Sequence, residues 1–231
     1  MERSVLKMDA KAAMREAVIS PYGVTVIYGI ILIILSVIQS FLDIWERILD
    51  KANGYIDPAQ LIAFIGSSIV FFIISFVITT IIEFGYSSFC LKVSNRDATM
   101  SYMDLFSSFR YLLKAIGLSV VTGILVLLWS LLFIIPGIIA AYRYSQAVFV
   151  MVEDPRKGIM QCIQESKDMM VGHKFEFFVL QLSFLLWELM GIFTCGLGYI
   201  YVYPYMNVTK ANYYNAVKPK TAFYGEYTMY E

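Results

Sequence analysis

Long apolar runs separated by short polar segments dominate the chain. A helix needs about 17 to 25 mostly apolar residues to cross the hydrocarbon of a bilayer. Runs of about this length predict six spans, at Val24–Leu42, Leu61–Leu91, Leu112–Ile135, Ile138–Val152, Phe175–Thr194 and Tyr199–Tyr214. Because a bilayer offers no partners to open strand edges, each span is predicted to be an α-helix.

Proline and glycine interrupt two pairs of these spans. Pro136 and Gly137 alone separate the third span from the fourth, and Gly196 and Gly198 lie in the short break between the fifth and the sixth. Both residue types break helices and permit tight reversals. These four residues therefore predict helix-breaking turns, and each pair of spans is expected to form a helical hairpin.

Lysine and arginine collect on one side of this arrangement. Those before span one, between spans two and three, between spans four and five and after span six are Arg3, Lys7, Lys11, Arg15, Lys92, Arg96, Arg110, Lys114, Arg156, Lys157, Lys167, Lys174, Lys210, Lys218 and Lys220. The opposite side has only Arg47 and Lys51, and Arg143 lies within a span. The positive-inside rule then predicts that both termini are cytoplasmic.

Composition agrees with a polytopic all-α membrane protein. The 231 residues are 59% hydrophobic and 16% charged, whereas soluble domains are about 45–50% apolar and about 25% charged. The net charge of zero gives no reason to expect a nucleic-acid partner. The three cysteines have no metal-binding or redox spacing, so no metal or cofactor is expected.

Each cytoplasmic segment also carries an apolar stripe with the i, i+4, i+7, i+11 spacing of one helix face. The three stripes are Leu6, Ala10, Ala13 and Ala17; Tyr102, Phe106, Phe109 and Leu113; and Ile159, Ile163, Ser166 and Met170. The spacing predicts amphipathic helices that lie in the membrane interface. Their basic residues would favour anionic lipid headgroups at the cytoplasmic face.

An aromatic motif recurs in every second span. Its three copies pair Phe84 with Tyr86, Tyr142 with Tyr144, and Tyr203 with Tyr205. The common order predicts three tandem units, each an interfacial helix followed by a membrane hairpin, at about residues 1–92, 93–152 and 153–217. Together they form a single membrane domain, 1–217, followed by a cytoplasmic tail, 218–231.

Three ionisable residues interrupt the spans: Glu83, Arg143 and Glu188. Arg143 and Glu188 are each six residues from an outer turn, so both lie about 9 Å below it. Because a lone charge in the bilayer costs at least about 2.5–3.5 kcal/mol, Arg143 is expected to pair with Glu188 or with Glu83. Such a cluster either fixes the packing of the helices or lines a substrate or proton pathway.

The C-terminal part resembles a bacterial integral-membrane family known as domain of unknown function 975. The resemblance rests on "PGIIAAYRYSQAVFVMVEDP" at 136–155, "SKDMMVGHKFEFFVLQLSF" at 166–184, Trp187, "TCGLG" at 194–198 and "PYMNVTKANYY" at 204–214. It implies a bacterial plasma membrane and no particular chemistry. A more distant similarity to the membrane portions attached to some glycerophosphodiester phosphodiesterases implies a lipid-related role.

The pattern favours a non-enzymatic membrane protein that binds a partner protein or lipid, in envelope maintenance or stress. A small-solute or ion transporter using Arg143 with Glu83 and Glu188 is the alternative. A lipid-modifying intramembrane enzyme is a third reading. It is the least favoured, because His173 is the only histidine and the chain has no catalytic signature such as HExxH or GxSxG.

Overall fold

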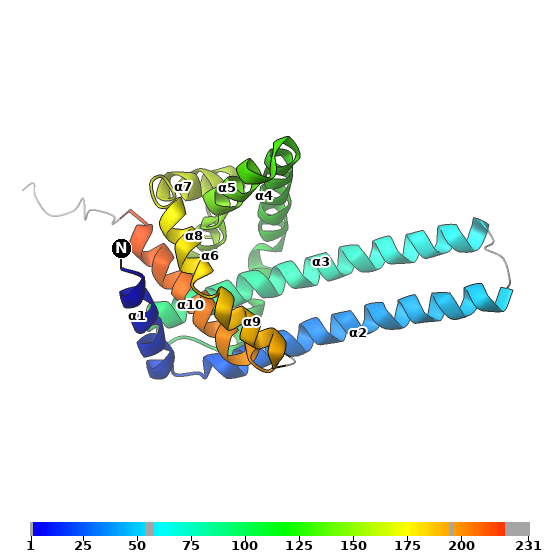
Figure 1. Ribbon diagram of the computed structural model, residues 1–231, viewed down its shortest axis with the longest axis horizontal. Coiled ribbons are helices and arrows are strands. Elements are labelled where there is room, and N and C mark those ends of the chain that lie inside the picture. Colours follow the sequence, from blue (N-terminus) through cyan, green and yellow to red (C-terminus); the bar gives the residue numbers. More distant parts are fainter. Residues whose placement is uncertain (1, 54–57, 195, 220–231) are drawn as a thin grey trace, which may run out of the picture.

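The computed structural model describes residues 2–53, 58–194 and 196–219, with side chains described outside 45–61. Helices account for nearly all of these residues (Figure 1). They are α1 (Arg3–Glu16), α2 (Pro21–Asn53), α3 (Pro58–Ser94), the 3-10 helix η1 (Tyr102–Tyr111), α4 (Leu112–Leu132), α5 (Ile134–Tyr144), α6 (Ala147–Glu153), α7 (Ile159–Met169), α8 (Lys174–Leu182), α9 (Leu185–Phe193) and α10 (Tyr199–Val217).

Five helical stretches are long and apolar enough to cross a membrane, at Pro21–Ile44, Ile62–Ser94, Tyr102–Leu132, Ile134–Glu153 and Lys174–Phe193. The all-α fold is therefore confirmed, and the five stretches indicate a multi-pass membrane protein. The sixth predicted span is the helix α10, which is not among the five because it carries Lys210 and several asparagines. Its crossing, and with it the cytoplasmic position of both termini, stays a prediction.

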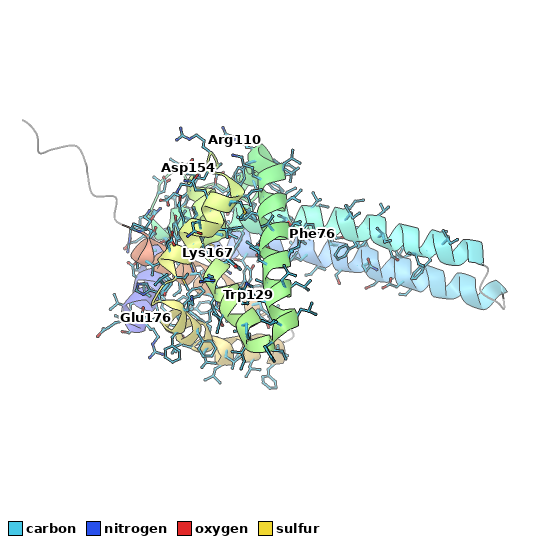
Figure 2. All side chains as sticks on the ribbon, turned by 90° about the horizontal axis from the view of Figure 1, so that it is seen from above. Phe76, Arg110, Trp129, Asp154, Lys167 and Glu176 are labelled. Atoms are coloured by element: carbon cyan, nitrogen blue, oxygen red, sulfur yellow. The ribbon has the colours of Figure 1, made fainter. Side chains whose placement is uncertain are left out.

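Helices α2 and α3 form a long hairpin that projects from the rest of the molecule (Figures 1 and 2). With 33 and 37 residues they are about 50 and 55 Å long, more than the roughly 30 Å of bilayer hydrocarbon. Beyond the base of the hairpin their apolar side chains stay exposed, as at Phe41, Phe72 and Ile73. Helix α4 runs steeply across the direction of this hairpin in both views.

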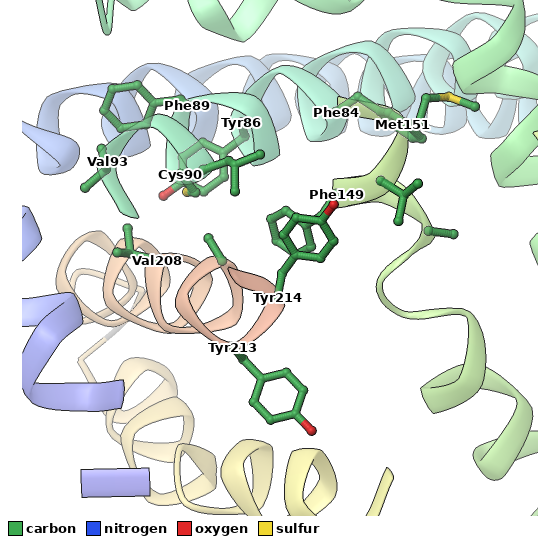
Figure 3. Packing of buried hydrophobic residues seen from close by; sticks show 14 of the residues in the cluster. Phe84, Tyr86, Phe89, Cys90, Val93, Phe149, Met151, Val208, Tyr213 and Tyr214 are labelled. Atoms are coloured by element: carbon green, nitrogen blue, oxygen red, sulfur yellow. The ribbon is translucent and has the colours of Figure 1, made fainter. Parts of the chain in front are cut away.

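The other helices pack around α10 and the C-terminal end of α3. Val208, Tyr213 and Tyr214 leave α10 in different directions and are all buried, as is Phe89 of α3 (Figure 3). Tyr214 stacks on Phe149 of α6 with ring centroids 5.5 Å apart. Aromatic packing of this kind adds to the stabilisation by burial, so this is the best-defined part of the core.

The three amphipathic segments do not share one orientation. In α1, Leu6, Ala10 and Ala13 are buried, and this helix packs mainly on α10, because alanines permit a close approach. In α7 the stripe is also turned inward, at Ile163 and Ser166. The stripe that starts in η1 is instead exposed. Its residues are Tyr102, Phe106, Phe109 and Leu113. This stripe alone among the three is exposed, but η1 is a 3-10 helix with three residues per turn, so its members do not share the single helix face that the spacing predicts.

The reversal between α4 and α5 comes one helical turn earlier than expected, at Phe133. Pro136 and Gly137 lie in the first turn of α5, where a proline loses no helical hydrogen bond. Gly137 lets the two helices touch, since a Cβ there would lie 2.0 Å from the Ser130 Oγ. Gly196, with φ +91°, and Gly198 do lie in the connection between α9 and α10.

Two of the candidate spans are interrupted helices. Between α5 and α6, the backbone N–H of Gln146 donates to the Ser166 hydroxyl at 3.2 Å, and that hydroxyl donates to the Arg143 carbonyl at 2.9 Å. Between α8 and α9, the Ser183 carbonyl accepts a hydrogen bond from the Lys7 ammonium at 3.3 Å. Side chains of α7 and α1 therefore satisfy the backbone groups that these breaks release.

Candidate functional site

The predicted charge cluster is only partly assembled. Arg143 in α5 is half-buried, and no carboxylate of the described residues lies within ion-pair distance of it. Glu83 in α3 and Glu188 in α9 instead interact electrostatically with a different cation, Lys210 of α10. The expected pairing of Arg143 with either glutamate is therefore absent from the described residues.

Lys210 is the cation next to Glu83 and Glu188, and the predicted charge cluster does not include it. The charge count places Lys210 with the cytoplasmic residues, although the predicted span Tyr199–Tyr214 contains it, and α10 contains it as well. The tyrosines and asparagines around it make this stretch look like the polar end of a span. The signal that could have found it is the distance of seven residues from Tyr203, which places both on one face of a helix.

Three tyrosines gather beside these charges. The rings of Tyr28, Tyr86 and Tyr203 come from α2, α3 and α10 and are 5.0 to 5.2 Å apart. The Tyr203 hydroxyl donates to the Tyr28 hydroxyl at 3.1 Å. The Thr25 hydroxyl donates to the Pro21 carbonyl, so at the 2.7 Å contact with Tyr86 the tyrosine is the donor.

Helix periodicity explains why these groups converge. Glu83, Tyr86 and Cys90 follow the i, i+3, i+7 spacing and share one face of α3. On another side of α3, η1 approaches Gly85 closely. A Cβ at this position would be 1.9 Å from the Leu105 carbonyl oxygen. The backbone of η1 therefore fixes the position of α3 and, with it, the direction in which Glu83 and Tyr86 project.

The cluster is open on one side. Glu83 is exposed, Glu188 and Lys210 are half-buried, and Tyr86 is only 2% exposed. No ion pair of the described residues contains any of the three charged groups, so each keeps hydrogen-bonding capacity. The Glu83 and Glu188 carboxylates both attract Lys210 electrostatically, and each can also accept a further cation or hydrogen-bond donor.

The remaining residues of the aromatic motif pack elsewhere. Phe84 is a buried core residue of α3. Tyr142 lies edge-on to Phe177 and Phe178, Tyr144 lies below the Lys167 ammonium, and Tyr205 packs against Phe184. The motif thus brings Tyr86 and Tyr203 together, while Tyr142 and Tyr144 lie at α8 and α7.

The described residues contain no group of three or more potential ligands that could hold a metal ion. Cys90 and Cys162 are buried, and burial raises the pKa of the Cys162 thiol, which disfavours the reactive thiolate. His173 Nδ1 lies 3.1 Å from the Glu176 carboxylate, near the start of α8.

Comparison with known proteins matches residues 131–221 to the family described as "Protein of unknown function (DUF975)". The match confirms the predicted resemblance and contains the sequence stretches on which it rests. No curated protein and no solved structure matches the chain. The matched range includes α5 to α10, and therefore Lys210 and Glu188, but not Glu83.

Proposed function

We propose that the protein is a non-enzymatic component of a bacterial plasma membrane that binds a membrane-protein partner through Glu83, Lys210 and Glu188. The observation that carries this proposal is the exposure of Glu83 within the candidate span Ile62–Ser94. A charge at such a site costs at least about 2.5–3.5 kcal/mol when it is unpaired, so a partner that offers a positive charge or donors gains affinity there.

The arrangement around Glu83 supports binding in preference to catalysis. Tyr28, Tyr86 and Tyr203 form a rigid aromatic wall of low conformational entropy, a property common at binding surfaces. Cys90 is buried, and no hydrogen bond among the described residues joins the His173 ring to a hydroxyl or thiol, so these residues show no nucleophile–base pair. A lipid-modifying enzyme therefore remains the least supported function.

One observation favours the alternative of a small-solute or ion transporter. Two candidate spans are interrupted, between α5 and α6 and between α8 and α9, and interrupted helices build many transport sites. Lys210 would then take the place assigned to Arg143. We rank this alternative second because no continuous pathway through the described residues supports it, whereas Glu83 is exposed.

Photo-crosslinking in native membranes tests the proposal. A photoreactive amino acid replaces Ser87, one turn from Glu83, or Phe72, which is 70% exposed on the outer part of α3. We expect a discrete protein adduct at position 87 that Glu83→Gln reduces at least fivefold, and lipid adducts at position 72 that do not change. Adducts at position 87 that are insensitive to Glu83→Gln would contradict it. Ion flux through reconstituted protein, abolished by Lys210→Met, would favour the transporter instead.

A further inference from the structure

A small polar pocket lies apart from the Glu83 cluster, where α1 meets the C-terminal ends of α3 and α10. Its volume is about 290 Å³. The residues that line it are Leu6, Asp9, Ser94, Asn212, Asn215 and Ala216. Four of these six residues are polar, so the pocket offers hydrogen-bonding groups on a molecule that exposes many apolar side chains.

All side-chain donors of this lining are already used. The Ser94 hydroxyl donates to Asn212 Oδ1 at 2.5 Å. The Asn212 amide donates to the Leu6 carbonyl and to the Asp9 carboxylate. The Asn215 amide donates to the Ser94 hydroxyl at 2.8 Å and to Asn95 Oδ1 at 2.7 Å. One hydroxyl and two amides have five protons to donate, and all five are engaged.

Acceptors, in contrast, remain free. Asn215 Oδ1 is buried and has no hydrogen-bond partner. The orientation of the Asn215 amide follows from its neighbours. A rotated amide would place its oxygen against Asn95 Oδ1 and the Ser94 oxygen. Ser94 could not donate to it, because its proton is given to Asn212. The Asp9 carboxylate also keeps unused lone pairs after its bonds to Arg96 and Asn212. The pocket can therefore satisfy a donor and cannot satisfy an acceptor.

The charge at the rim has a matching sign. Arg96 bonds to both Asp9, at 2.7 Å, and Glu16, at 2.6 Å, so two carboxylates share one guanidinium. Arg96 adopts φ +54°, in the left-handed region that residues other than glycine seldom occupy. The turn after α3 thus accepts backbone strain and directs Arg96 to α1, where its single positive charge is shared between Asp9 and Glu16.

We propose that this pocket binds a primary ammonium group, supplied by a free small amine or by the headgroup of an aminophospholipid. An ammonium carries one positive charge and three donors and has no acceptor, which complements the Asp9 carboxylate in the pocket lining. A volume of about 290 Å³ admits ethanolamine with room to spare, so recognition rests on the charge and the donors of the ligand. A quaternary ammonium has the charge but no N–H, so the pocket distinguishes the two.

Thermal unfolding of the purified full-length protein in detergent tests this inference. We expect the unfolding midpoint to rise with ethanolamine concentration, and to be unchanged by ethylene glycol or tetramethylammonium at equal ionic strength. Asp9→Asn should weaken the apparent affinity for ethanolamine at least tenfold, measured against the midpoint of the same variant without ligand. Asp168→Asn, the same change on α7, serves as the matched control and should respond like the wild type.

Nanodiscs distinguish the two sources of the ammonium. If a lipid supplies it, discs of phosphatidylethanolamine raise the midpoint relative to phosphatidylcholine, Asp9→Asn removes the difference, and added ethanolamine has an effect only in phosphatidylcholine. If a free amine supplies it, ethanolamine acts equally in both. A midpoint that does not respond to ethanolamine in any setting, that responds equally to tetramethylammonium or K⁺, or that responds equally in Asp9→Asn overturns the inference.

Discussion

The side chains at the two ends of helix α3 differ in exposure and in their hydrogen-bond partners. At the outer end, Ile62, Phe72 and Ile73 are exposed, and polar side chains bond within their own helix, as Thr79 does to the Ser75 carbonyl. At the base, from Thr80 to Ser94, most side chains are buried and bonds connect different helices, such as Lys92 to Asp104. The exposed side chains of the outer end are thus suited to contact with lipid. Specific contacts between helices begin only at the base.

Glycine substitutions should give the largest difference between the two ends. Gly85→Ala places a Cβ 1.9 Å from the Leu105 carbonyl oxygen, so η1 must move, and we expect a loss of about 3 kcal/mol in unfolding free energy. Gly66→Ala, in the outer part of the same helix, meets no atom within 4 Å and should stabilise it by about 0.5–1 kcal/mol. Unfolding in mixed detergent measures both. Equal effects would mean that η1 does not rest on α3.

Serine substitutions should show the same contrast with a smaller effect. Ser166→Ala leaves the Gln146 N–H and the Arg143 carbonyl without partners in a buried place, and we expect a loss of about 2 kcal/mol. Ser40→Ala in the exposed part of α2 should change the unfolding free energy by less than about 0.5 kcal/mol. A loss for Ser166→Ala no larger than that for Ser40→Ala would show that water replaces the serine.

A double-mutant cycle tests which charges are coupled at the base of the hairpin. Glu83→Gln and Lys210→Gln should show a coupling of about 1 kcal/mol, since each single change leaves the other charge less compensated. Arg143→Gln with Glu188→Gln should be additive within about 0.5 kcal/mol, because no contact joins them in the described residues. The reverse result would restore the pairing that the sequence suggested.

Acid should give the smallest effect of the four changes at two loops outside the hairpin. The Asp97 carboxylate accepts the Thr99 N–H at 2.8 Å, and Asp154 accepts that of Arg156 at 3.1 Å. These backbone hydrogen bonds lower the pKa of both carboxyls. The stability that these hydrogen bonds contribute is therefore complete above the unfolded-state pKa of about 3.9. It is lost as the pH falls through the lower pKa values of the folded state.

Hydrogen exchange between pH 6 and pH 3 detects this loss as faster opening at residues 97–99 and 154–156, corrected for intrinsic rates. The outer part of α2 and α3 should keep its protection. A double variant, Asp97→Asn with Asp154→Asn, should show less pH dependence at these two loops. Uniform loss of protection along the chain would instead indicate global acid unfolding.

Hydropathy was sufficient to predict the helical fold and five candidate membrane spans, because a bilayer constrains length and polarity directly. It could not predict which charges meet. Equal depth suggested that Arg143 and Glu188 pair, but depth gives no information on the direction in which a side chain leaves its helix. Lys210 was missed for a related reason, since α10 is stabilised by neighbouring helices and its own sequence does not need to look apolar.

The polarity of α10 also constrains how the protein is made. A lysine at the centre of a segment adds about 2.5–3.5 kcal/mol to its transfer into a bilayer, and α10 carries asparagines as well. Asn212 finds its partners at Leu6, Asp9 and Ser94, all synthesised earlier. For α10 to enter the bilayer as predicted, α1 and α3 must already be in place to receive it. Biogenesis would then proceed in a fixed order, with the C-terminal helix last.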